Sequence, residues 1–364
     1  MFGTIRRKVK IASRRKNEVV YEQLGPHDTG LFRFYQLKQR TSEFFYQNLG
    51  RCNVEVHDTP HYVLASALND GTDDERCKAE EFYTRYLQAS WGSDASLDRI
   101  KTKIQSFRAL FFMIKKDGIK KAPVLTYLTD GGPAHIVDGN HRVAIAAALG
   151  ISFRAEVWPL DLAFLKYSRM PEFYGSGNLD MPYQGLYVGD VECIPGRRND
   201  LITRLKLIPR DAISGQEILD VASNVGVSSL IAHTYGARSC LGIELSQPMV
   251  DIATRFAMFS GSYPMVQYRN INLDKQTLLP SQSFDTAFMF SIYDHLKDPS
   301  VLLQLADRHV RKFVVFEGHP GGEAKNYSSF LHSGVFARVT ELGRLHTSRF
   351  KIDHSRILWL CEKM

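Results

Sequence analysis

The chain has 364 residues, enough for two domains of ordinary size, and its 44% hydrophobic and 23% charged residues are typical of a soluble globular protein. Its five cysteines include no Cys-x-x-Cys pair, which argues against a structural zinc site and a disulfide framework and suits a reducing cytoplasm. No apolar run approaches the roughly 20 residues that span a bilayer. We therefore expect a cytoplasmic protein without a metal centre.

The formal net charge of +7 originates at the amino terminus. Seven basic residues lie from Arg6 to Lys16, before the first acidic residue, Glu18, and without them 39 basic residues face 39 acidic ones. Residues 1–20 are predicted to be a basic tail. The tail is expected either to be solvated or to contact anionic lipid at the inner face of the membrane. Because the rest of the chain is neutral, a nucleic-acid partner is not expected.

The first part of the chain predicts mixed secondary structure. Residues 17–50 carry an aromatic-rich pattern that favours helix, and residues 53–61 read as a short strand followed by a turn. Helices are predicted over Ala79–Ala89 and Leu97–Lys115.

A strand–glycine–helix pattern follows. Val124–Tyr127 and His135–Val137 predict a hairpin, and the turn Asp138-Gly-Asn-His-Arg142 leads into an alanine-rich helix over Val143–Leu149. Helix N–H groups beside a guanidinium suit phosphate oxygens. The alternative is that Arg142 only packs over its own helix and that the turn binds nothing.

This turn resembles the phosphate-cradling Gly-x-His-Arg loop of the ParB/sulfiredoxin-like fold. The resemblance implies a smaller α+β domain over residues 21–168 that binds ATP or another nucleotide, with Mg²⁺ if it is a kinase, for which Asp58 and His61 could supply the base. The implied nucleotide-binding residues are Asp138, Gly139, Asn140, His141 and Arg142.

Residues 169–210 are predicted to be a linker. From Met170 to Asp200, glycines and prolines are frequent enough to break regular elements, which marks a domain boundary. Tyr183, Arg197 and Arg198 favour a lid whose side chains face an acidic substrate. A connector that packs against both domains is the alternative.

A second strand–turn–helix pattern begins at Glu217. Ile218–Val221 is a short apolar strand, the small residues after Asp220 form a turn that ends at Gly226, and Val227–His233 is a helix. About 24 residues after Asp220, the strand over Ser239–Leu245 contains Glu244, placed to accept from a ribose diol.

These motifs resemble those of class I S-adenosylmethionine (SAM)-dependent methyltransferases, with Ala222 in place of the first loop glycine. Strands over 266–273, 283–291, 312–317, 336–342 and 356–361 extend the likeness. The resemblance implies an α/β fold with a Rossmann-like seven-stranded methyltransferase sheet over residues 211–364. The cofactor-binding residues that it implies are Asp220, Ala222, Ser223, Asn224, Gly226, Glu244, Leu245, Asn272 and Ser291.

Methyl transfer to a hydroxyl needs a proton acceptor at the carboxyl ends of the fourth and fifth strands. The candidates are His319, then His295, with Glu317 and Asp294. Each histidine could instead be a structural group, and Asp294 could cap its helix.

The expected activity is methylation of a small molecule, sugar or glycan end. One alternative is a nucleic-acid methyltransferase whose ParB-like domain recognises DNA, although the Asn/Asp-Pro-Pro-Tyr loop of amino-methylating DNA enzymes is missing: residues 291–294 read Ser-Ile-Tyr-Asp. The other is a nucleotide-sensing amino-terminal module without catalysis.

Overall fold

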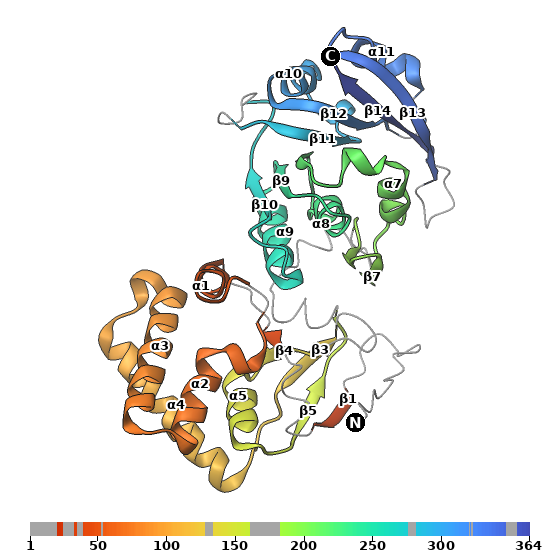
Figure 1. Cartoon of the computed structure of the whole chain (residues 1–364). Coiled ribbons are helices and arrows are strands. Elements are labelled where there is room, and N and C mark those ends of the chain that lie inside the picture. Colours follow the sequence, from red (N-terminus) through yellow and green to blue (C-terminus); the bar gives the residue numbers. More distant parts are fainter. Residues whose placement is uncertain are drawn as a thin grey trace. The chain divides into compact units, whose positions relative to one another are not determined.

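The computed structural model describes residues 20–24, 33–34, 39–51, 54–127, 134–160, 183–275, 282–319, 321, 323–346 and 355–364. The chain forms two compact units, residues 1–169 and 170–364, and each has its own sheet (Figure 1). The predicted basic tail lies outside the described residues, apart from its last position.

The amino-terminal unit is built on a five-stranded mixed sheet in the order β1-β5-β3-β4-β2. The strands are β1 (Val20–Leu24), β2 (Arg33–Phe34), β3 (Val124–Tyr127), β4 (Ala134–Asp138) and β5 (Phe153–Val157). The helices are α1 (Gln39–Leu49), α2 (Pro60–Asp70), α3 (Asp73–Trp91), α4 (Leu97–Asp117) and α5 (Asn140–Leu149). The predicted β3–β4 hairpin and the helix after it are confirmed.

Two local predictions for this unit are wrong. The helical pattern over 17–50 gives strand β1, because it pairs antiparallel with the distant β5, and helix starts only at α1. The expected strand before His61 is instead a short 3₁₀ helix, Val56–Asp58, that leads into α2. The Thr59 hydroxyl accepts from Tyr62 N, and Pro60 occupies the first turn, so the chain enters helix there.

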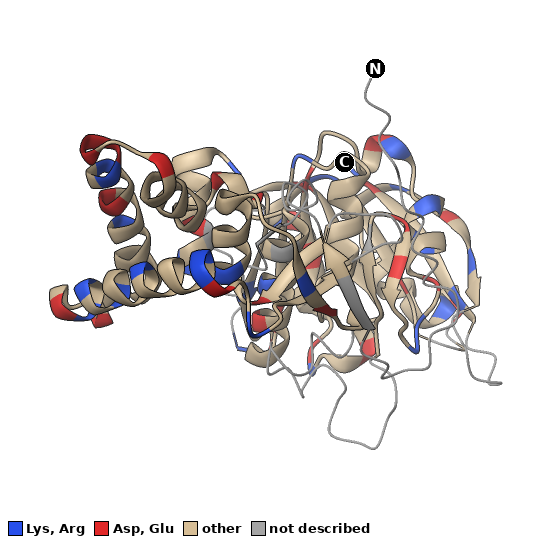
Figure 2. Cartoon of the chain, turned by 90° about the horizontal axis from the view of Figure 1, so that it is seen from below, with Lys and Arg blue, Asp and Glu red and all other residues tan. Residues whose placement is uncertain are grey.

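Charged residues of both signs alternate along the helices of the amino-terminal unit, at the left of Figure 2. Several form ion pairs within or between helices, such as Lys78 with Asp74 and Arg108 with Glu80. These positions are therefore a solvated, mixed-charge surface. Among the described helices, none combines the length and the apolar character that crossing a membrane requires.

The carboxyl-terminal unit contains a seven-stranded sheet in the order β10-β9-β8-β11-β12-β14-β13. Its strands are β8 (Glu217–Val221), β9 (Ser239–Glu244), β10 (Val266–Asn270), β11 (Phe284–Phe290), β12 (Val310–Glu317), β13 (Phe336–His346) and β14 (Ser355–Lys363). Strands β8 to β12 are parallel, while β14 is antiparallel to both neighbours. The predicted Rossmann-like sheet of seven strands is thus confirmed.

Helices connect these parallel strands: α8 (Val227–Thr234), α9 (Gln247–Ser260) and α10 (Ser300–His309), with α7 (Leu201–Leu207) ahead of β8 (Figure 1). Residues such as Leu219, Ala287 and Val314 are completely buried at the centre of the sheet. The chain moves outward in one direction through β9 and β10 and in the other through β11 and β12. The order reverses between β8 and β11, where open α/β sheets bind ligands.

Part of the predicted linker is regular. Strands β6 (Leu186–Val188) and β7 (Val191–Ile194) form an antiparallel hairpin, although the frequent glycines were expected to exclude regular elements. Gly189, with φ of 58°, makes the left-handed turn, and Leu186 and Ile194 are buried. The glycines shape the hairpin instead of preventing it.

Candidate active site

The loop after β8 is held in a conformation that needs small residues. Ala222, Asn224 and Gly226 have φ values of 57°, 52° and 76°, all in the left-handed region. A Cβ on Gly226 would lie 2.3 Å from the Tyr268 ring, whose hydroxyl donates to Gly226 O at 2.7 Å. Ala222 therefore adopts a backbone that glycine favours, as expected of the position where the methyltransferase pattern has glycine.

Glu244, at the end of β9, fastens this loop. Its Oε2 accepts from Asn224 N at 2.9 Å, and its Oε1 accepts from Ser246 N at 2.9 Å. A carboxylate oxygen has two lone pairs, so each oxygen can still accept one more donor. The residue is thus oriented by the backbone and can receive two hydroxyls of a diol.

Asp220 lies beneath the same loop with 2% of its surface exposed. It accepts from the Ser229 hydroxyl at 2.7 Å. Burial raises the pKa of Asp220 to about 6, against the lowering effect of the Ser229 hydrogen bond. The hydrogen bonds that lower the pKa of Asp220 come from Ser229 alone, so this buried carboxylate is prepared to receive a further polar or positive group.

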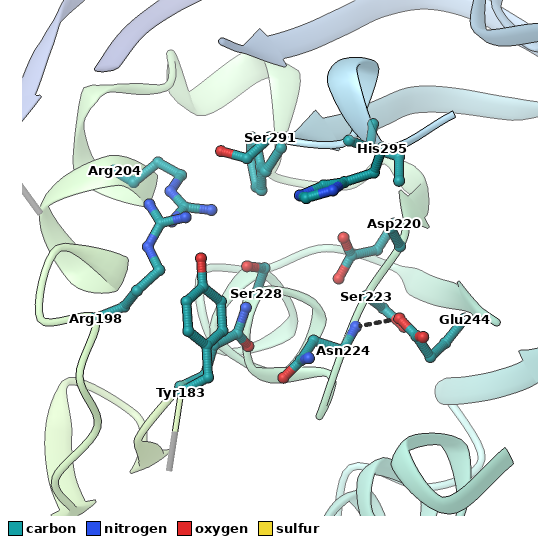
Figure 3. Close-up of a pocket in the computed structure, with 14 residues that line it drawn as sticks. Tyr183, Arg198, Arg204, Asp220, Ser223, Asn224, Ser228, Glu244, Ser291 and His295 are labelled. Carbon is teal, nitrogen blue, oxygen red and sulfur yellow. Dashed lines mark hydrogen bonds between the residues drawn. The ribbon is translucent and has the colours of Figure 1, made fainter. Parts of the chain in front are cut away.

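These residues line a cavity of about 210 Å³ in the carboxyl-terminal unit. Its walls come from the segment before β8, the loop after β8 and the ends of β9 and β11 (Figure 3). The predicted site residues that line it are Tyr183, Arg198, Asp220, Ala222, Ser223, Asn224, Glu244, Ser291 and His295. The cavity lies where the strand order reverses, as the topology requires.

Three predicted cofactor residues do not line this cavity: Gly226, Leu245 and Asn272. Gly226 acts through the loop's shape, and Leu245 is 62% exposed. Asn272 Oδ1 accepts from Asp274 N at 3.0 Å and so caps a turn. The amide that contacts the loop after β9 is instead Asn270, whose Nδ2 donates to the Leu245 carbonyl at 2.6 Å.

A buried ionic cluster adjoins the cavity. Arg198 donates from Nε and Nη2 to both oxygens of Asp200, at 3.0 and 2.6 Å, and from Nη1 to Glu317 Oε1 at 3.3 Å. Arg204 Nε lies 2.9 Å from Glu317 Oε2, and Arg356 Nη1 lies 3.7 Å from Glu317 Oε1. Five charged side chains therefore share one buried region.

The cluster corrects the expectation of Glu317 as a proton acceptor. Glu317 is fully buried and does not line the cavity. Burial alone would raise its pKa, but the guanidinium groups of Arg204 and Arg198 outweigh burial and lower it. The same two arginines, against burial, lower the pKa of Asp200 to about 2. Both carboxylates thus stay ionised and bound, which makes them structural counter-ions.

The two predicted histidines form a pair in which only His295 lines the cavity. His295 Nε2 and His319 Nε2 are 3.0 Å apart, and His319 Nδ1 lies 3.0 Å from Asp294 Oδ2. Burial lowers the pKa of His319, although Asp294 acts in the opposite direction. The geometry reverses the predicted preference: His295 faces the cavity, and His319 and Asp294 stand behind it.

Of the predicted substrate residues, Arg197 does not line the cavity, and its guanidinium lies 5.5 Å from the centre of the Tyr183 ring. Burial would raise the pKa of the Tyr183 phenol, but Arg198 and Arg356 outweigh burial and lower it. Sequence reasoning missed Arg204, which lines the cavity and is 1% exposed. Its signal was its position among the apolar residues of α7, Leu201 and Leu205.

The predicted nucleotide turn of the amino-terminal unit has a different environment. Arg142 Nη1 donates to the carbonyls of Lys121 and Ala122 at 2.6 and 3.0 Å, and its Nη2 donates to Asp138 at 3.0 Å. His141 Nε2 lies 2.9 Å from the Tyr83 hydroxyl, and burial lowers its pKa to about 3. In this structure Arg142 follows the structural alternative, because its guanidinium is already bound by the protein.

Metal binding is the remaining chemistry to consider. Within the described ranges of the chain, no group of three or more His, Cys, Asp or Glu side chains is arranged to hold a metal ion.

The parallel sheet, its reversal point and the polar loop at that point define a Rossmann-like α/β domain with a nucleotide-type site. Residues 219–315 match the model of a family described as "Methyltransferase domain". The carboxyl-terminal unit therefore contains a methyltransferase domain.

Similar proteins carry related names. A segment of 99 residues is 27% identical to the ubiquinone biosynthesis O-methyltransferase of Paracidovorax citrulli (strain AAC00-1). It covers 27% of this chain and 41% of that protein, so the chain spans less than half the length of the curated relative that it matches.

Among solved structures, the magnesium protoporphyrin IX methyltransferase of Synechocystis PCC 6803 with bound SAM is 18% identical, with a TM-score of 0.36 over 45% of this chain and 77% of that one. The N-terminal domain of EvdMO1, solved in the presence of SAH and D-fucose, is 15% identical, with a TM-score of 0.39 over 50% and 90% of the two chains.

Proposed function

We propose that this protein transfers the methyl group of SAM to a hydroxyl of a small molecule. The observation that carries the proposal is the Glu244 carboxylate, which fastens the loop after β8 by Asn224 N while keeping two oxygens able to accept a ribose diol. The match of residues 219–315 to the methyltransferase domain family supports it.

The residues of the cavity fit this cofactor. Ala222 and Gly226 leave the loop backbone without bulky side chains, and Ser223 Oγ is buried with no hydrogen-bond partner among the residues that the structure describes. Asp220 offers negative charge to the cationic amino-acid portion. When bound, SAM supplies a methyl carbon on a sulfonium, and the electrons of the broken C–S bond remain on sulfur.

The chain's own residues orient the acceptor and remove its proton as the O–C bond forms. His295 is placed for this role because it lines the cavity beside Ser291 at the end of β11. Asp294 Oδ2, 3.0 Å from His319 Nδ1, favours a proton on that nitrogen through its charge, without a hydrogen bond of good geometry. In that tautomer His319 Nε2 accepts from His295 Nε2–H, which leaves His295 Nδ1 to take the proton of the acceptor. His319 and Asp294 are thus positioning residues.

The test is calorimetric titration of the full chain with SAH, followed by a mass-spectrometric screen of hydroxylated metabolites for the added methyl mass. Glu244→Ala should weaken SAH binding while the fold persists, and His295→Ala should lower kcat by roughly 100-fold or more with SAH affinity kept. A wild-type chain that binds neither SAM nor SAH would refute the proposal.

Two further expectations stay proposals. The ParB/sulfiredoxin-like nucleotide site of the amino-terminal unit is supported by Gly139, which begins α5 with φ of 94°, and by Asn140 Oδ1, which is buried without a hydrogen-bond partner. Titration with ATP, CTP and Mg²⁺ tests it: binding without turnover favours a sensor, and turnover favours a kinase. Stimulation of methyl transfer by DNA would instead favour the nucleic-acid alternative.

A further inference from the structure

The end of the cavity nearest β12 carries one more buried positive charge than negative. The side chains of Arg198, Arg204 and Arg356 are 5%, 1% and 9% exposed, and those of Asp200 and Glu317 are 2% and 0% exposed. Among the described residues, three guanidinium groups therefore contact two carboxylates, and a third buried carboxylate, Asp220, lies on the other side of the cavity and interacts with Arg204 through its charge. A buried charge without a counter-ion is costly, so such an excess indicates a ligand that completes the cluster.

Several buried polar atoms in and beside this end of the cavity also lack a hydrogen-bond partner among the described residues. Within the described ranges, Arg356 Nε has no hydrogen-bond acceptor, and neither Gln184 Oε1 nor Ser223 Oγ has a hydrogen-bond partner. Arg204 Nε and Arg356 Nη1 have only their ion-pair contacts with Glu317. Gln184 and Ser223 line the cavity, and each is less than one-tenth exposed. The cavity lining thus has an unused amide oxygen and an unused hydroxyl beside the buried guanidinium groups.

The two ends of the cavity carry side chains of opposite charge. Figure 3 shows Arg198 and Arg204 on one side and Asp220 and Glu244 on the other, with the Tyr183 hydroxyl directed toward the arginines. The carboxylate end adjoins β8 and β9, where the proposed cofactor, a cation at its sulfur, would bind. The arginine end adjoins β11 and β12, through Phe290 under Arg204 at 4.5 Å and through Glu317.

We propose that Arg204 and Arg198, which we call the arginine wall, bind an anionic oxygen group of the methyl acceptor. The acceptor is then an organic acid, carrying a carboxylate or phosphate as well as the hydroxyl that is methylated. Nε, Nη1 and Nη2 of Arg198 already donate to Asp200 and Glu317, so Arg198 contributes positive charge, and the direct hydrogen bonds to the anion come from Arg204, which lines the cavity. The inference rests on the proposed function and adds the class of substrate to it.

The first experiment needs no variant. The full chain saturated with SAH is titrated calorimetrically with benzoate, with phenylphosphate and with benzamide, which is neutral and close to benzoate in shape. At least one of the two acids should bind roughly tenfold or more tightly than the amide, because only an acid completes the cluster. Equal or absent binding of all three, with SAH still bound, overturns the inference and leaves the proposed function standing.

The second experiment identifies which ligand the arginine wall holds. Arg204→Lys keeps the charge but loses the fork of donors, so it should remove the preference for acids and leave SAH affinity within about twofold. Arg338→Lys, at an exposed position of β13, is the matched control and should change neither.

The cofactor's own carboxylate is the competing anion, and 5′-methylthioadenosine, which lacks the amino-acid portion of SAH, distinguishes it. If Arg204→Lys weakens SAH but not methylthioadenosine, the wall binds the cofactor and the inference is wrong. If the wild-type chain binds no SAH at all, the proposed function fails, and the inference falls with it.

Discussion

The chain contains two strand–turn–helix units with similar sequence patterns and different outcomes. In the amino-terminal unit, the turn between β4 and α5 is filled by its own side chains: Arg142 binds backbone carbonyls, and the half-buried His141 contacts the Tyr83 hydroxyl. In the carboxyl-terminal unit, the turn between β8 and α8 borders a cavity, and within the part of the chain that the structure describes the Ser223 hydroxyl has no hydrogen-bond partner. A glycine turn before a helix therefore becomes a site only if the surrounding elements leave its polar groups free.

The largest expected effect is steric and falls on the second turn, where the Tyr268 ring packs against Gly226. Gly226→Ala would place a Cβ 2.3 Å from Tyr268 at a positive φ, so we expect a loss of about 2–5 kcal/mol in the free energy of unfolding. Gly150→Ala, at φ of 65° with nothing within 4 Å, is the matched control in the other unit and should lose only about 1 kcal/mol. Urea unfolding of both variants measures the difference, and equal losses would contradict it.

Acid should weaken the amino-terminal unit through His141. Its pKa in the folded state, about 3, lies below the ordinary 6.5. Its stabilising contribution to the free energy of unfolding is therefore present above pH 6.5 and is lost as the pH falls toward 3. Between pH 7 and pH 4 the loss should be about 3 kcal/mol. Hydrogen exchange in α5, corrected for intrinsic rates, should report it, and His141→Gln should reduce the pH dependence. Unchanged protection of α5 at pH 4 would refute the prediction.

Asp220 should act in the opposite direction in the carboxyl-terminal unit. Its folded pKa of about 6 exceeds the ordinary 3.8, so its stabilising contribution is present at low pH and is lost as the pH rises through 6. In the absence of cofactor, the free energy of unfolding of Asp220→Asn relative to that of the wild type should therefore be about 2 kcal/mol higher at pH 7 than at pH 4. Unfolding of both proteins by urea at pH 4 and at pH 7 measures this change. The same difference between variant and wild type at both pH values would contradict a raised pKa of Asp220.

Arg142→Met tests whether the first turn is structural. The substitution keeps the side-chain stem but removes three hydrogen bonds, so unfolding of the amino-terminal unit should become easier by about 2 kcal/mol. If Arg142 acts only on the protein, ATP and CTP affinity measured by calorimetry will stay the same. A selective loss of nucleotide affinity with unchanged stability would return this arginine to a phosphate-binding role.

Glu244→Gln gives the smallest expected change and addresses the second turn. The amide keeps the shape but replaces one accepting oxygen by a donor that faces a backbone N–H, so SAH affinity should fall by about tenfold. Glu217→Gln, at the other end of the adjacent strand, should leave it unchanged. Calorimetry with SAH compares the two variants, and an equal loss in both would argue against a direct role of Glu244.

Local sequence patterns were sufficient to predict the carboxyl-terminal sheet. They were also sufficient to predict four residues that line the cavity: Asp220, Ser223, Asn224 and Glu244. A buried parallel strand is a short apolar run, and its carboxyl end is fixed by the same pattern, so residues placed just after such strands meet at one edge of the sheet. The sequence by itself therefore determined the fold of this unit and most of the loop side of its cavity.

Only the tertiary structure decided what distant charged groups do. Glu317 ends a parallel strand as a catalytic carboxylate would, yet Arg204, more than 100 residues earlier, binds it and keeps it ionised. The same holds for Arg142, whose partners are carbonyls of the segment before β3. Coulombic and hydrogen-bond energies depend on distances between chain segments and on burial, and a linear pattern contains neither.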